Sequence, residues 1–277
     1  MRLFICGARG STPAPGPDFL RYGGHTSCVA VARDGQPPSL VVDAGTGLRR
    51  VTPLLEGRPF RGAIILGHLH WDHTHGLPFF RAGDDDDSRV DVYLPAQGPD
   101  PEEALAQGMS PPNFPVRPSQ LRGDWRFFGL DEGAHEMAGF QVLAREIPHK
   151  GGRTFGYRVS DGRASFAYLS DHHPLSAGPG EAGFGEYHES AMELARGVDL
   201  LIHDAQYTAE EFPARQHFGH SAIDYAIGLA AACDARRLLL FHHDPPRTDD
   251  EIDAIVEKLG DAPVPVSAAV EGEVIDL

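Results

Sequence analysis

Histidine is concentrated in one short stretch of this sequence. The segment GHLHWDHTHG, residues 67–76, holds His68, His70, Asp72, His73 and His75. Neutral imidazole nitrogens and carboxylate oxygens are the usual protein ligands of zinc and similar divalent ions. The alternative is a polar surface loop that happens to be rich in histidine. A metal site is favoured if further ligands converge on this segment from elsewhere in the chain.

Further His and Asp residues lie at the ends of apolar, strand-like runs. On five separate runs, the residues at such ends are His68 and His70, His149, Asp171, His203 and Asp204, and His242. In layered α/β folds, ligands collect just beyond the carboxyl ends of strands. His68 and His70 are two apart, so an extended backbone would point both the same way. Asp72 and His73 would follow a turn and face a second point nearby. We therefore expect these side chains to form a metal site at one edge of the fold, beyond the strand ends.

The order of expected elements indicates how this edge is built. We expect strands at 1–6, 27–32, 39–45, 62–70, 90–95, 125–130, 140–149, 155–160, 164–171, 198–205 and 236–244. Helices are expected from about 46, at 188–197, at 221–234 and at 248–260, the last capped by Thr248. Residues 98–123, rich in proline and glycine, predict a partly helical excursion. Strands that come first and later alternate with helices favour a mixed, layered α/β fold.

Composition limits the classes of function. The 277 residues carry 24 Lys+Arg against 40 Asp+Glu, a formal charge of −16, which argues against a broad basic face for a long polyanion. A small anionic substrate remains compatible, because bound cations reverse the sign locally. The chain has three cysteines, Cys6, Cys28 and Cys233, and no two of them have the spacing of metal ligands. This odd number without metal-ligand spacing predicts buried, reduced thiols and a cytoplasmic protein. No apolar run is long enough to span a membrane.

The central motif resembles that of a known family. HLHWDHTHG is similar to the HxHxDH signature of the metallo-β-lactamase superfamily, and VVDAGTG, with Asp43, is similar to its upstream Asp motif. The resemblance covers residues from about 1 to 250. It implies an α/β fold, a four-layer αββα sandwich, with two metal ions at one edge. It also implies a single domain over residues 1–277.

The resemblance also implies a ligand set. His68, His70 and His149 would hold one ion. The second would be held by Asp72, His73 and His242, with Asp171 bridging the two. His243 is the rival of His242, and His172 and His173 beside Asp171 depart from the family pattern. His75 would lie outside both ligand sets. Zinc is the expected metal, with manganese or iron as alternatives.

Two later segments resemble the ribonuclease Z branch. LLIHDAQY carries Asp204, and HFGHSAIDYAIGLA carries His220. In that branch the histidine assists phosphodiester cleavage and the acidic residue orients it; Asp72 would orient or deprotonate the nucleophile. The plain alternative for His220 is a hydrogen bond at the start of a helix. These features predict a dinuclear hydrolase, a phosphodiesterase acting on a small phosphodiester such as a cyclic nucleotide.

Other functions stay open. Enzymes of this branch that process transfer RNA carry a protruding arm between the positions that match His149 and Asp171. Here these residues are only 22 apart, which with the charge of −16 makes extended nucleic-acid binding unfavourable. The alternatives are a tRNA 3′-end endonuclease, a lactone or thioester hydrolase, and a metal-bearing sensor without turnover. Assembly into a homo-oligomer is a further alternative to a monomer.

Three further features concern the surroundings of the site. The segment MSPPNFPV, residues 109–116, is interpreted as a lid whose Phe114 stacks on a base, or else as a packed surface loop. Phe79 and Phe80 are expected in the core. RYGGHTSC places His25 where similar bacterial proteins of the same fold have asparagine, and the role of His25 is open.

Overall fold

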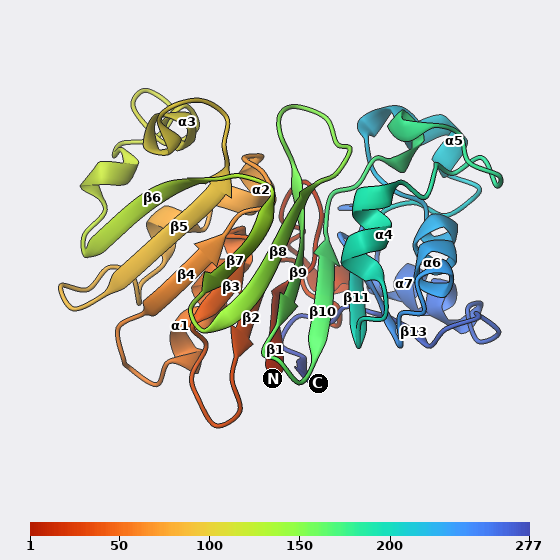
Figure 1. Ribbon diagram of the computed structural model, residues 1–277, viewed down its shortest axis with the longest axis horizontal. Coiled ribbons are helices and arrows are strands. Elements are labelled where there is room, and N and C mark those ends of the chain that lie inside the picture. Colours follow the sequence, from red (N-terminus) through yellow and green to blue (C-terminus); the bar gives the residue numbers. More distant parts are fainter.

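Two seven-stranded mixed sheets form the centre of the protein, which we describe over residues 1–277 from a computed structural model (Figure 1). The first sheet has the order β14-β1-β2-β3-β4-β5-β6. Its strands are β1 (Arg2–Gly7), β2 (Cys28–Ala32), β3 (Leu40–Val42), β4 (Arg61–Ile65), β5 (Arg89–Pro95), β6 (Asp124–Leu130) and β14 (Val274–Asp276). The second sheet has the order β13-β12-β11-β10-β9-β8-β7. Its strands are β7 (Gly133–Met137), β8 (Phe140–Glu146), β9 (Phe155–Ser160), β10 (Ser165–Leu169), β11 (Leu200–Asp204), β12 (Leu238–Phe241) and β13 (Val266–Ala268).

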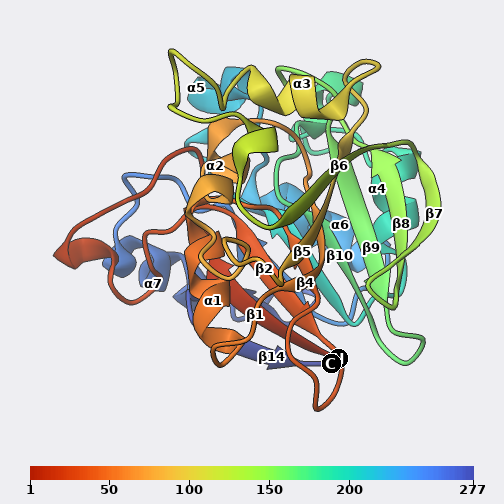
Figure 2. The ribbon, with the colours of Figure 1, turned by 90° about the vertical axis from the view of Figure 1, so that its left-hand side faces the viewer.

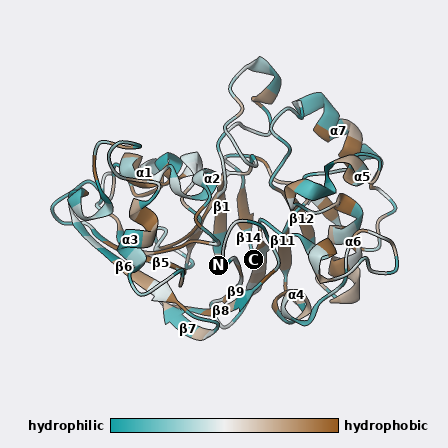
Figure 3. Cartoon of the chain, turned by 90° about the horizontal axis from the view of Figure 1, so that it is seen from above, coloured by the Kyte–Doolittle hydropathy of each residue, from teal (hydrophilic) through white to brown (hydrophobic).

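Helices cover the outer face of each sheet (Figure 3). The α-helices are α1 (Val51–Leu54), α2 (Trp71–Thr74), α3 (Pro101–Ala106), α4 (Glu189–Ala195), α5 (Phe212–Arg215), α6 (Ile223–Ala232) and α7 (Asp249–Glu257). Short 3-10 helices are η1 (Pro17–Phe19), η2 (Thr46–Arg50), η3 (Leu77–Phe79), η4 (Pro118–Gln120), η5 (Pro174–Ala177) and η6 (Gln216–Phe218).

Three apolar cores separate the layers. The core between the sheets takes Leu3 and Val31 from the first sheet and Tyr157 and Phe241 from the second. A second core lies under η2 and α1, and a third lies under α4 and α6. The central strands β3, β10, β11 and β12 are buried at every position because both of their faces are covered. The four-layer αββα sandwich expected from the sequence is confirmed.

Strand direction brings many carboxyl ends to one edge. Strands β3 to β6 are mutually parallel, and so are β10 to β13. Strand β1 runs the same way as β3 because both pair antiparallel with β2, and β8 runs the same way as β10 through β9. The two sheets meet at this edge, where the Gly10 N–H donates to the His243 carbonyl at 2.9 Å. The chain termini lie together at the opposite edge (Figure 2), where the Leu277 N–H bonds to the Met1 carbonyl.

Most expected elements form, with instructive exceptions. The expected strand at 62–70 is too long, since β4 ends at Ile65 and His68 and His70 lie in the following loop. Strands β7, β13 and β14 were not expected. Strands β13 and β14 have three residues each and lie at sheet edges, so they lack the apolar pattern of an inner strand. The excursion at 98–123 is confirmed as partly helical, with α3 and η4.

Two other expectations concern side-chain burial and membranes. All three cysteines are free and buried, as expected. No helix in the structure is both long and apolar enough to cross a membrane.

The N-terminus of α7 provides a test of local stability. The Thr248 side chain accepts a hydrogen bond from the Glu251 N–H, and the Glu251 side chain accepts one from the Thr248 N–H. Thr248→Ala should lower the free energy of unfolding by about 1 kcal/mol, because the amide of Glu251 loses its partner. Urea titration measures this, and Thr248→Ser, which keeps the hydroxyl, should retain most of the stability. Equal stability of the alanine variant and the wild type would contradict the role of the cap.

Candidate metal centre

The histidine-rich segment is divided by the start of α2. After β4, the Gly67 N–H donates to Asp43 Oδ1 at 2.7 Å, and His70, which precedes the first residue of α2, has an extended backbone. The helix then turns the chain, so that Asp72 and His73 project differently from His68 and His70. The turn predicted between the two pairs is therefore present, although the residues before it belong to a loop and not to the strand.

A first group comprises His68, His70, His149 and Asp171, whose ligand atoms all lie within 4.8 Å of one another. His149 Nδ1 lies 2.9 Å from the Gly219 carbonyl and donates to it, so Nε2 faces the group, 3.5 Å from Asp171 Oδ1. Both ring nitrogens of His68 are buried and lack a hydrogen-bond partner. An orphaned buried nitrogen among imidazoles and a carboxylate is what a bound divalent cation would satisfy.

A second group comprises Asp72, His73, Asp171 and His242. His73 Nε2 lies 2.9 Å from Asp171 Oδ2 and 3.2 Å from Asp72 Oδ2. His242 Nε2 lies 3.1 Å from Asp72 Oδ2 and 3.4 Å from Asp171 Oδ2. Asp171 thus directs Oδ1 toward the first group and Oδ2 toward the second, which is the arrangement a bridging carboxylate requires. The donor atoms suit a pair of divalent ions.

Hydrogen-bonding partners outside the two groups hold these side chains in place. Asp43, which follows β3, accepts from His73 Nδ1, the Gly67 N–H and the Tyr168 hydroxyl, each at 2.7 Å. The first of these bonds fixes the ring so that Nε2 faces the group. Asp72 Oδ2 accepts from the Ser11 N–H at 2.8 Å. Sequence reasoning missed Ser11, whose only signal was its place just after the first strand.

The two groups differ in electrostatics. Burial lowers the pKa of His149 to about 4 and that of His68 well below its usual value, so these rings are neutral and offer lone pairs. Burial also acts to lower the pKa of His242, but Asp171 and Asp72 outweigh it and raise the pKa to about 9. In the second group, protons on the imidazoles balance carboxylate charge. A divalent cation would supply that positive charge instead.

His220 and Asp204 lie beside both groups. His220 Nδ1 lies 3.0 Å from Asp204 Oδ2, and its ring stacks on His242 with centroids 4.7 Å apart. Asp204 is fully buried and also accepts from the N–H groups of His172 and Gln206, each at 3.1 Å. Asp204, His220 and His242 also meet the geometric requirement for a third metal-binding group. The predicted pair therefore forms, and its role stays a prediction.

A chain of histidines lies behind this pair and was not expected. His172 Nδ1 lies 2.9 Å from His203 Nε2, and His172 Nε2 lies 2.7 Å from His188 Nε2. His203 Nδ1 lies 2.7 Å from the Asp204 carbonyl. Burial lowers the pKa of His172, His188 and His203, so neutral rings can each donate once and accept once along the chain. The sequence showed His172 only as a departure from the family pattern.

The remaining histidines lie outside both groups. His243 Nε2 bonds to the Ala269 carbonyl at 2.9 Å, so the geometry favours its neighbour His242 as the ligand. His75 stacks on Trp71, and His25 Nδ1 lies 3.2 Å from Thr46 Oγ1. His173 is half-buried and belongs to neither group.

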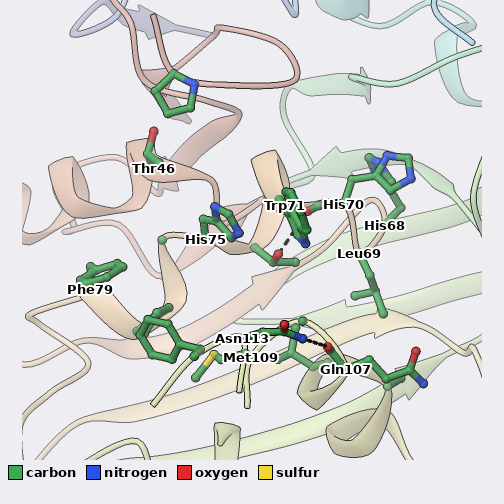
Figure 4. A pocket seen from close by; sticks show the side chains of 18 of the residues that line it. Thr46, His68, Leu69, His70, Trp71, His75, Phe79, Gln107, Met109 and Asn113 are labelled. Carbon is green, nitrogen blue, oxygen red and sulfur yellow. Dashed lines mark hydrogen bonds between the residues drawn. The ribbon is translucent and has the colours of Figure 1, made fainter. Parts of the chain in front are cut away.

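Two adjoining spaces give access to the site. A small opening of about 330 Å³ is lined by Ser11, Leu69, His70, Trp71, Asp72, Asp171 and His220. A larger cavity of about 1270 Å³ shares Leu69, His70 and Trp71 with it and extends to Met109, Asn113 and Phe114 of the expected lid (Figure 4). The expectation for Phe79 is wrong: Phe80 is buried, but Phe79 is 65% exposed and lies edge-on to Phe114 in the wall of this cavity.

The close approach of Gly10 to His242 allows a test of the second group. A Cβ at Gly10 would lie 2.5 Å from His242 Nδ1, so Gly10→Ala should displace the ring. We expect the zinc content of dialysed protein to fall from two ions per chain toward one, as measured by mass spectrometry of the metal. Gly260→Ala is the matched control because a Cβ there meets nothing within 4 Å. Unchanged metal content in folded Gly10→Ala protein would refute the assignment of His242.

Comparison with known proteins gives a consistent result. Residues 39–243 match the family model described as the beta-lactamase superfamily domain. A ribonuclease Z of Limosilactobacillus fermentum is 28% identical over 65% of this chain and 68% of its own length. The metallo-beta-lactamase fold protein YhfI from Bacillus subtilis has a TM-score of 0.73 at 19% identity, covering 99% of each chain. A diphosphatase from the PhnP family has a TM-score of 0.72 at 20% identity, covering 100% of this chain and 97% of its own. This chain therefore belongs to the metallo-β-lactamase superfamily, within which it resembles the ribonuclease Z-like branch.

Proposed function

We propose that this protein is a two-metal phosphodiesterase that hydrolyses a small phosphodiester. One observation carries the proposal: His220, held from behind by the buried Asp204, lines a small opening together with Asp72 and Asp171, at the point where the two ligand groups meet. Cleavage of a phosphodiester releases an alkoxide that must take up a proton, and a histidine oriented by a carboxylate can supply that proton. The similarity to proteins named ribonuclease Z favours a phosphodiester over a carboxylic ester as the bond that is cleaved.

The ligand groups define where the metals would sit. His68, His70 and His149 would hold one ion, Asp72, His73 and His242 the other, and Asp171 would bridge them. Zinc is the proposed metal, and manganese or iron suits the same nitrogen and oxygen donors. When bound, such ions supply Lewis-acid activation of water and of a phosphoryl oxygen.

The side chains around the opening would complete the reaction. Asp72, held by the Ser11 N–H, would orient the attacking water and take up the proton that it loses, while the water oxygen forms the new bond to phosphorus. The bond from phosphorus to the leaving alkoxide oxygen breaks. His220 would donate its Nε2 proton to that oxygen, while Asp204 holds Nδ1 and stabilises the charged ring. The products are a phosphomonoester and an alcohol.

The form of the protein favours a small substrate. The residues between His149 and Asp171 are taken up by β9, β10 and their short connections, so no protruding arm is present there. The charge of −16 also opposes long polyanions. The alternative is a tRNA 3′-end endonuclease, which the similarity to proteins named ribonuclease Z favours.

A turnover screen of the metal-loaded protein tests the proposed reaction. It should compare bis-(p-nitrophenyl) phosphate and cyclic nucleotides with lactones, thioesters and a tRNA precursor. We expect turnover of the small phosphodiesters. Activity confined to lactones or thioesters, or no turnover at all, would overturn the proposal, and selective cleavage of the tRNA precursor would establish the alternative.

The role of His220 is tested by substitution. His220→Ala should lower kcat on a small phosphodiester by about 10²- to 10⁴-fold, because the leaving group loses its proton donor. The bound metal content should remain at the wild-type value, since His220 is not assigned as a ligand. His135→Ala is the matched control, because His135 lies on the edge strand β7 and belongs to neither ligand group. Full turnover in metal-loaded His220→Ala protein would show that the assigned role is wrong.

A further inference from the structure

The charge of the larger cavity is opposite to that of the protein. The chain carries 40 acidic and 24 basic residues, yet no Asp or Glu is among the 27 residues that line this cavity. The lining does include Arg49, Arg81 and Arg153, together with four histidines. Exclusion of carboxylates from so large a surface of an acidic protein indicates that the cavity accepts negative charge.

Two of these arginines are free to bind a ligand. Arg153 forms ion pairs with Glu146 and Asp131, so its charge is already balanced. Arg49 and Arg81 are exposed and form no ion pair or side-chain hydrogen bond in the structure. Their segments are tied together, because the Ala82 N–H donates to Thr52 Oγ1 at 3.2 Å. Two guanidinium groups on joined segments of one cavity wall can hold a phosphate-like group.

The wall between these arginines and the metal centre is aromatic. Trp71 is 68% exposed and Phe79 65% exposed, which is unusual for large apolar side chains. His75 stacks on Trp71 at an interplanar angle of 17° and fixes its orientation. Exposed aromatic faces of this kind suit a planar ring, for which stacking contributes about 1–3 kcal/mol.

The cavity is continuous with the site of the proposed reaction. Leu69, His70 and Trp71 line both the larger cavity and the small opening that contains His220. In Figure 4, Phe79 lies across the cavity from His68 and His70, with Trp71 and His75 between them. Arg81 lines the same cavity and follows Phe79 by two residues, so its backbone lies close to that of Phe79.

We infer that the substrate carries a second, phosphate-like anionic group, joined to the scissile phosphodiester through a planar or apolar part. The scissile phosphorus lies at the small opening, the planar part lies along Trp71 and Phe79, and the second anion binds Arg49 and Arg81. This inference rests on the proposed phosphodiesterase function and narrows its substrate class to compounds with two phosphate groups. Arg49 and Arg81 act in specificity and take no part in bond cleavage.

A pair of chromogenic substrates tests the second anion site. Thymidine 5′-(p-nitrophenyl phosphate) is compared with the same compound bearing a 3′-phosphate, using the metal-loaded full chain. The 3′-phosphate should raise kcat/KM about tenfold in the wild type, which corresponds to about 1.4 kcal/mol. In the double variant Arg49→Gln, Arg81→Gln the ratio of the two kcat/KM values should fall to about one. Because the readout is a ratio, a general loss of activity cancels.

The matched control removes the same charge elsewhere. Arg61 and Arg163 form no ion pair and do not line the cavity, so Arg61→Gln, Arg163→Gln should keep the wild-type ratio. Loss of the ratio in this control would show that net charge, and not the site, is responsible. A wild-type ratio of one would overturn the second anion site while leaving the phosphodiesterase intact.

A binding measurement separates this inference from the proposed reaction. The chain has two tryptophans, so Trp125→Phe leaves Trp71 as the only one and makes its fluorescence a probe of the cavity. Thymidine 3′,5′-bisphosphate should quench it with about tenfold lower Kd than thymidine 5′-phosphate, and the Arg49→Gln, Arg81→Gln substitutions should abolish the difference. This outcome without phosphodiester turnover would support the anion site and reject the phosphodiesterase. Equal affinities for the two nucleotides would reject the anion site.

Discussion

Buried negative charge at one sheet edge is the constraint on which the rest of the structure depends. Asp43, Asp72, Asp171 and Asp204 are all buried, and each lies within hydrogen-bond reach of a histidine. Removing an ionised carboxylate from water costs several kcal/mol unless it is paired. Protonated imidazoles offset part of this free-energy cost, and bound divalent cations would offset more of it. His73 and His242 carry protons that compensate these aspartates, whereas the neutral rings of His68 and His149 would offer lone pairs to a cation.

The fold meets this requirement because the site residues lie at or beyond the ends of seven strands that point to the same edge: β1, β3, β4, β8, β10, β11 and β12. The loop after β1 brings Ser11 to Asp72, Asp43 directly follows β3, and His242 directly follows β12. Asp43 and His242 both have a φ of 60°, a region that costs energy for residues other than glycine. Both lie where a strand stops and a site residue must turn inward. The surrounding hydrogen bonds and apolar cores hold this local strain.

The sequence predicted the residues that meet far better than the contacts that hold them. The spacing of the histidine motif and the recurrence of His and Asp after apolar runs predicted which residues would lie together in the two groups, since both features survive small errors in strand boundaries. Ser11 was missed because its role depends on the direction of β1, which follows only from pairing with β2. Phe79 was misplaced because apolar character does not distinguish the core from the wall of an open cavity. The histidine chain behind Asp204 was missed because it joins β11, α4 and the loop after β10, and no spacing in the sequence reveals such a contact.

Asp204 and His220 could serve either as metal ligands or as a proton donor with its orienting carboxylate, and these two roles have to be distinguished. Together with His242 they satisfy the geometry of a metal-binding group, yet in our proposal His220 donates a proton and binds no metal. Anomalous diffraction at the zinc absorption edge, from crystals of zinc-loaded protein, distinguishes the two directly. We predict two peaks, one among His68, His70 and His149 and one among Asp72, His73 and His242, with Asp171 between them. A single peak, or a peak coordinated by His220 and Asp204, would contradict the central claim.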